Sequence, residues 1–106
     1  MIFRYFTHAF VDQFAQHSVD QFEAAVPNRE FTLELGKQSA KRVEKIELAL
    51  RHLLTSIQRF DTEQKLNVFQ HARLAQQLQN HMIDHGYPPQ FARDIAAKVS
   101  RMRVRH

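Results

Sequence analysis

The chain has 106 residues, with 43% hydrophobic and 25% charged residues, which is the size and composition of one globular domain. It contains no cysteine, so disulfides, thiolate nucleophiles and cysteine-ligated metal centres are excluded. The formal net charge is +4, and all of this excess lies in the last ten residues, AKVSRMRVRH, which contain four basic residues and no acid.

The first predicted helix runs from about Phe3 to Val26. Its phenylalanines at positions 3, 6, 10 and 14 are spaced by three and four residues, which places them on one helical face. The tetrapeptide Val-Asp-Gln-Phe occurs twice in this segment, and eight residues turn a helix about 80° beyond two full turns. We interpret this repeat as packing periodicity rather than a duplicated unit. Ser18 and Gln21 could also form a capping box that interrupts the helix.

The second predicted helix follows Pro27, which ends the first one. The stretch between them, around Phe31 and Leu33, could begin as an extended segment or as an early helical turn. Leu48 lies on the face opposite the main apolar seam, which favours a central position or contact with a second chain. The seam is spaced by three and four residues: Val43, Ile46, Leu50, Leu53, Ile57 and Phe60.

The third predicted helix is capped by Asp61, with Gln64 three residues later, and it ends at Gly86. Leu66 and Leu74 lie on its polar side. Its predicted inner arc consists of Val68, Phe69, Ala72, Ala75, Leu78, Met82 and Ile83. A short fourth helix begins at Pro89, and its apolar residues are Phe91, Ile95, Val99 and Met102.

The sequence therefore predicts an all-α fold, a small antiparallel helical bundle of three longer helices plus a short C-terminal helix. Residues 1–97 form the single helical-bundle domain, and residues 98–106 form a basic C-terminal helix end or tail. The apolar start is interrupted by charged residues and no apolar run approaches 18 residues, so we expect neither a signal peptide nor a membrane span. The lack of cysteine fits the reducing cytoplasm, where we expect the protein to act.

We predict that the chain is not an enzyme and uses no cofactor. Its two glycines stand alone, so no glycine-rich phosphate loop is present, and its carboxylates are spread evenly. His81 and His85 are four residues apart and could share a metal ion, with His71 or Asp94 as the nearest third ligand. The alternative is two solvated histidines at a helix C-terminus, and the sequence leaves this open.

One spacing at the C-terminus points to a ribonuclease. Arg101 and His106 stand in an Arg-x4-His arrangement, which resembles the catalytic motif of the HEPN ribonucleases, a family of small helical bundles. The resemblance implies a HEPN-like ribonuclease as the third alternative for the function.

The chain has more apolar helix faces than a unit of this size can easily bury, which indicates a protein interface. We therefore predict a protein-interaction module, an adaptor or regulator that forms a homodimer and binds another protein. The predicted contact residues are Ile2, Phe3, Phe6, Leu48, Leu66 and Leu74.

The alternative function is a nucleic-acid-binding accessory protein. A basic stripe on the last helix could contact phosphates through charge, or it could be a solvated helix end. Its residues are Lys98, Arg101, Arg103 and Arg105.

Overall fold

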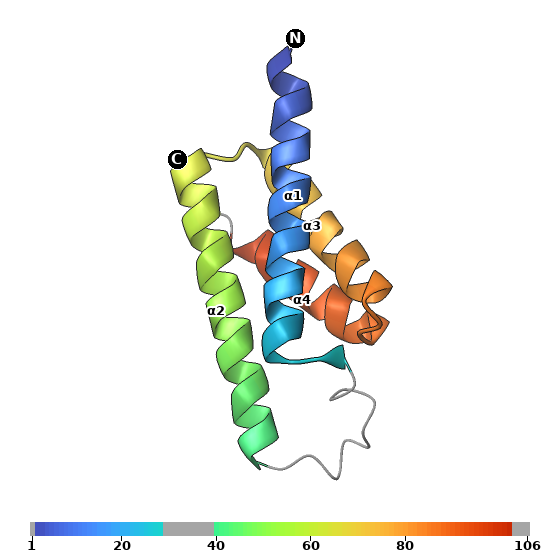
Figure 1. Cartoon of the computed structure of the whole chain (residues 1–106). Coiled ribbons are helices and arrows are strands. Elements are labelled where there is room, and N and C mark those ends of the chain that lie inside the picture. Colours follow the sequence, from blue (N-terminus) through green and yellow to red (C-terminus); the bar gives the residue numbers. More distant parts are fainter. Residues whose placement is uncertain (1, 29–39, 103–106) are drawn as a thin grey trace.

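The structure is a computed structural model that describes residues 2–28 and 40–102, with side chains described from residue 9 onward. Four helices make up almost all of these residues (Figure 1). They are α1 (Ile2–Ala25), α2 (Ala40–Gln64), α3 (Val68–Asp84) and α4 (Pro89–Arg101). The stretch that the sequence left open between extended and helical, around Phe31, lies outside the described residues.

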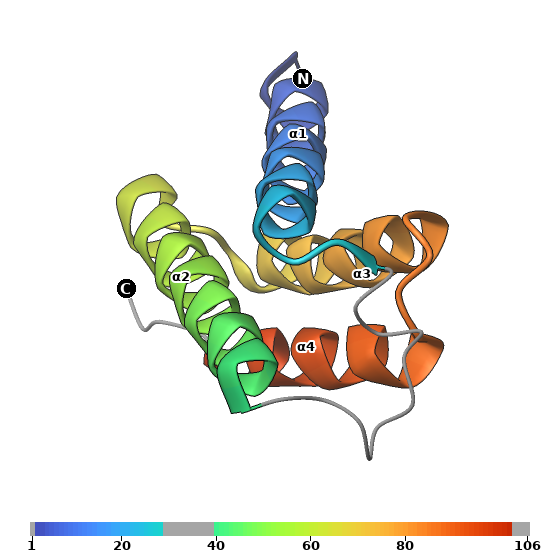
Figure 2. The same ribbon diagram turned by 60° about the horizontal axis from the view of Figure 1, so that its bottom comes forward.

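The predicted all-α bundle is confirmed, because the described residues form four packed helices and contain no strand. Helices that follow one another in the chain run in opposite directions (Figure 1). Figure 2 shows α3 and α4 side by side, with α1 standing on α3, and Figure 1 shows α2 alongside α1. None of the helices in this part of the chain is both long and apolar enough to cross a membrane.

Helix α1 contributes an unbroken apolar stripe to the core. The predicted interruption at Ser18 is wrong, since α1 is continuous and Ser18 is buried within it. The adjacent face packs on α2, where the rings of Phe14 and Phe60 stack with centroids 3.8 Å apart and Phe10 lies 4.9 Å from Phe60. The buried stripe is spaced by three and four residues: Val11, Ala15, Val19, Phe22 and Val26.

The connection between α2 and α3 differs from the prediction in where α2 ends and in which residue caps α3. Asp61 does not cap α3, because α2 continues through Gln64 and ends where Lys65 adopts a left-handed backbone with φ of 49°. The Leu66 amide then donates to the Asp61 carbonyl at 3.3 Å, which is the bond pattern of a Schellman motif. The cap of α3 is Asn67, in a reciprocal capping box with a glutamine three residues later.

Helix α3 is rotated by about 70° from its predicted orientation. His71 and Leu74 face the core, whereas Val68, Phe69 and Ile83 of the predicted inner arc are exposed. Apolar residues lie on several faces of α3, so the sequence pattern alone did not show which face is buried. Helix α3 makes core contacts on two sides, because it packs against α1 and against α4.

The corner between α3 and α4 is tied to the end of α1. Gly86 has φ of 89°, a left-handed conformation that favours glycine. The buried Tyr87 hydroxyl donates to the Val26 carbonyl at 2.5 Å, and the Asn28 amide donates to the His85 carbonyl at 2.6 Å. Helix α4 begins at a proline after this corner, as predicted. It continues past residue 98, where the sequence divided the domain from the tail.

Candidate functional site

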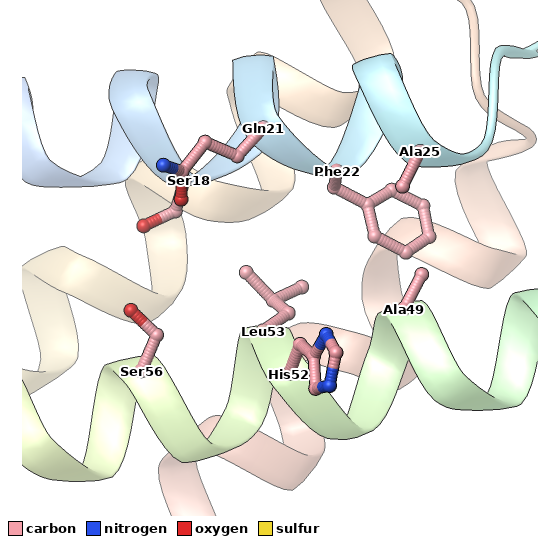
Figure 3. Close-up of a pocket in the computed structure, with 8 residues that line it drawn as sticks. All are labelled: Ser18, Gln21, Phe22, Ala25, Ala49, His52, Leu53 and Ser56. Carbon is pink, nitrogen blue, oxygen red and sulfur yellow. The ribbon is translucent and has the colours of Figure 1, made fainter.

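A pocket of about 170 Å³ lies between α1 and α2 (Figure 3). Each helix contributes four residues at the spacing that places them along one face. Because several of these side chains are small, the two helices touch without filling the space between them. The lining residues are Ser18, Gln21, Phe22 and Ala25 from α1, and Ala49, His52, Leu53 and Ser56 from α2.

The pocket has a polar end and an apolar end. The hydroxyls of Ser18 and Ser56 lie at one end, and the Phe22 ring with Ala25 and Ala49 lies at the other (Figure 3). Ser18 is only 3% exposed, and its hydroxyl makes no hydrogen bond within the described ranges 9–28 and 40–102. The two hydroxyls at this end of the pocket can both donate and accept hydrogen bonds, so this end is suited to a hydrogen-bonding group.

The pocket residues do not form a catalytic arrangement. A serine nucleophile needs a histidine base that is oriented by a third group, usually a carboxylate. His52 lies at the exposed rim, and the lining includes no acidic side chain. The described residues also contain no cluster of three or more side chains that could hold a metal ion.

His85 of the predicted metal pair lies among acidic side chains of α1. Its Nδ1 contacts a carboxylate oxygen of Glu23, and its Nε2 lies 3.5 Å from Oδ1 of Asp20. His81 is partly buried one turn earlier on α3. The structure thus gives His85 a role in attaching α1 to the end of α3.

A second polar contact between α1 and α3 lies nearer the start of both helices. Two nitrogens of the Arg73 guanidinium donate to the two carboxylate oxygens of Asp12, each at 2.8 Å. The hydrogen bond that Arg73 donates to Asp12, and then the charge of that carboxylate, raise the pKa of Arg73 above its ordinary value. Both Asp residues of the Val-Asp-Gln-Phe repeat therefore lie beside basic residues of α3, because His85 lies beside Asp20.

Asp61 and His71 form a buried polar pair that the sequence did not predict. The His71 Nε2 lies 2.7 Å from the carbonyl of Val99 in α4, and its Nδ1 lies 3.2 Å from Oδ2 of Asp61, outside good hydrogen-bond geometry. The sequence indicated His71 only as a possible third ligand for a metal ion. The pair connects the end of α2, the first turn of α3 and the last turn of α4.

The predicted protein-contact residues have different positions in the structure. Leu48 is 51% exposed on α2, as expected for a surface contact. Leu66 and Leu74 are 2% and 0% exposed, so the prediction that they lie on the polar side is wrong, and both belong to the core. Ile2 and its two neighbouring predicted contacts, Phe3 and Phe6, belong to α1, but their side chains lie outside the described residues.

Helix α3 has an exposed row of mainly apolar residues, which is a candidate contact surface different from the two buried leucines. Phe69 is 79% exposed and Ile83 is 38% exposed, and both lie on the side of α3 that faces away from the core. Ala72 and Gln76, at steps of three and four, complete a row with heptad-like spacing, and both are exposed. We call these four residues the α3 outer stripe. To predict the α3 outer stripe from the sequence, one would have had to know which face of α3 is buried.

The predicted basic stripe is only partly described. Lys98 and Arg101 are exposed on α4, and neither has an ion pair within the described residues. Arg103, Arg105 and the histidine of the Arg-x4-His spacing, His106, lie outside that part of the chain. The resemblance to HEPN ribonucleases therefore stays a prediction from sequence.

Comparisons with known proteins give no relative for this chain. No protein-family model matches it, and neither a curated protein nor a solved structure is significantly similar to it.

Proposed function

We propose that the chain is a non-enzymatic protein-interaction module, an adaptor or regulator, and that it associates with a second copy of itself through the α3 outer stripe. The observation that carries this proposal is the 79% exposure of Phe69, with the half-exposed Val68 beside it. Large aromatic side chains on rigid elements are typical anchors of protein interfaces. Exposed apolar side chains that are aligned on one helix face favour a helix as the partner.

The outer stripe is self-complementary. Phe69 and Ile83 lie fourteen residues apart, which is about 21 Å along a helix, and Gln76 lies midway between them. A two-fold axis at Gln76 would align two copies of α3 antiparallel, with Phe69 of each chain facing Ile83 of the other. The stripe has no charged residue, so this arrangement places no like charges against each other.

The oligomeric state tests the proposal. Size-exclusion chromatography with light scattering, over a series of protein concentrations, should show a dimer for the original chain and a monomer for Phe69→Lys. Gln58→Lys is the matched control, because it adds the same charge at an exposed position of α2 and should leave the dimer intact. A monomer at every concentration, or equal dimerisation of both variants, would contradict the proposal. Leu48→Lys, measured in the same way, tests the contact on α2 that the sequence predicted.

Nucleic-acid binding is the second candidate, favoured by the exposed Lys98 and Arg101 on α4. Binding of labelled DNA and RNA should weaken with salt, because counterions are released when basic side chains neutralise phosphates. Replacing both residues with glutamine should reduce the slope of log affinity against log salt by about two. A chain shortened at residue 97 is unsuitable, because it removes the buried Val99 from the core.

The control for this experiment is the double replacement of Lys41 and Arg51 with glutamine. Both residues are exposed on α2, and the change in net charge is the same. Fluorescence anisotropy should distinguish the two double variants. If they bind equally, the attraction comes from overall charge and not from α4.

A further inference from the structure

We propose that the pocket between α1 and α2 is a binding site for a small neutral molecule that combines an apolar ring with one hydroxyl group. The pocket lies on a different surface from the α3 outer stripe, so this proposal does not depend on dimerisation. It rests on the size of the pocket, on its division into polar and apolar ends, and on the unpartnered hydroxyl of Ser18.

The size of the pocket matches a single ring. Its volume of about 170 Å³ is close to the cavity of about 150 Å³ that accommodates benzene in an engineered protein core. The apolar end can cover the two faces of such a ring, because the Phe22 side chain approaches it from α1 and Leu53 from α2 (Figure 3). Ala25 and Ala49 leave the room that larger side chains would fill.

The polar end sets the chemistry of the ligand's substituent. Ser18 has no hydrogen-bond partner among the described residues, and its hydroxyl lies at the same end of the pocket as that of Ser56 (Figure 3). Ser56 offers a second hydroxyl from the facing helix, and Gln21 borders the same end. A ligand hydroxyl can both donate to and accept from such groups, which an apolar ring alone cannot do.

The charge of the lining favours a neutral ligand. Apart from His52 at the exposed rim, the described residues that line the pocket have no ionisable side chain. A carboxylate or an ammonium group would lose hydration on entering without gaining an opposite charge inside. The site is therefore suited to phenol-like molecules and discriminates against charged analogues of similar size.

Nuclear magnetic resonance titration of the full chain tests the proposal with three probes: phenol, toluene and benzoate. Phenol should shift the backbone amides of the pocket residues with a dissociation constant on the order of 1 mM. Toluene lacks the hydroxyl and should bind about five-fold more weakly, which corresponds to one hydrogen bond. Benzoate should leave the pocket amides unchanged.

Two variants assign the binding to the two ends of the pocket. Ser18→Ala should remove the preference for phenol over toluene without unfolding the chain, since the hydroxyl that it removes has no partner among the described residues. Ala25→Leu should fill the apolar end and weaken phenol at least about ten-fold. Ala24→Leu is the matched control, because Ala24 is exposed on the same helix but does not line the pocket.

Three outcomes would overturn the proposal. The first is equal binding of all three probes, or shifts scattered over the surface. The second is unchanged phenol affinity in Ala25→Leu. The third is movement of the pocket amides with protein concentration alone, which would show that a second copy of the chain occupies the pocket.

Discussion

Loss of the Asp61 carboxylate should strongly destabilise the chain. Asp61 and His71 are both buried, and the Val99 carbonyl can only accept a hydrogen bond, so the His71 Nε2 must carry the hydrogen between them. In a neutral ring, Nδ1 is then a lone pair that faces the carboxylate at 3.2 Å. The Asp61 carboxylate is therefore the group that this side of the buried ring faces.

Two replacements of Asp61 separate charge from hydrogen bonding. Asp61→Ala leaves the buried ring without its partner, and breaking a buried pair in this way should lower the free energy of unfolding by about 3–5 kcal/mol. Asp61→Asn also removes the charge, but its amide can donate to Nδ1 of a neutral ring while the bond to Val99 remains. We therefore expect a smaller loss, about 1–2 kcal/mol.

Urea denaturation, followed by far-ultraviolet circular dichroism, measures both losses. For a domain with a typical stability of about 5–15 kcal/mol, the larger loss is a substantial part of the total. In thermal unfolding, Asp61→Ala should lower the Tm by at least about 10 °C. Equal losses in the two variants, or a loss below about 1 kcal/mol for Asp61→Ala, would refute the reasoning that His71 needs a partner.

Three further changes can be measured by the same denaturation assay. Tyr87→Phe removes the bond to the Val26 carbonyl and should cost about 1–2 kcal/mol, whereas an unchanged midpoint would show that this bond contributes nothing. Gly86→Ala should cost about 1–3 kcal/mol, because the residue has φ of 89° and a Cβ would lie 2.4 Å from the Asn28 side-chain nitrogen; a neutral effect would mean that the corner relaxes freely. Asn67→Ala removes the cap of α3 and should cost about 1 kcal/mol, while Asn67→Ser should restore most of it.

The sequence predicted where the helices lie along the chain better than it predicted which face of each helix is buried. Spacings of three and four residues located α1, α2 and α4, because each presents one clear apolar stripe to the core. Helix α3 has apolar residues on several faces, so its pattern did not define which side is buried. The inward position of His71 also depends on a carbonyl of α4 that is distant in the sequence.

The pocket could not be predicted for a related reason. Its lining combines small residues of two helices, such as Ser18 and Ala49, and small residues in a helix pattern give no sign of which helix they will face. Leu48, by contrast, was placed correctly on the surface, because its position opposite the seam of α2 decides its exposure. The sequence thus predicted exposure correctly where it depends on one helix, but it did not predict features that depend on how two helices pack.

The hydrogen bonds at the end of α1 imply that local stability differs between parts of the chain. The contacts of Tyr87 and Asn28 attach α1 to the α3–α4 hairpin, although these elements are separated by the whole of α2 in the sequence. The first nine residues of α2, residues 40–48, include no buried residue. In hydrogen exchange, amides there should open well before those of α1 and α3, because local unfolding begins where little surface is buried. Helix α1 is then held to the α3–α4 hairpin, while the segment between them can open without breaking either hydrogen bond.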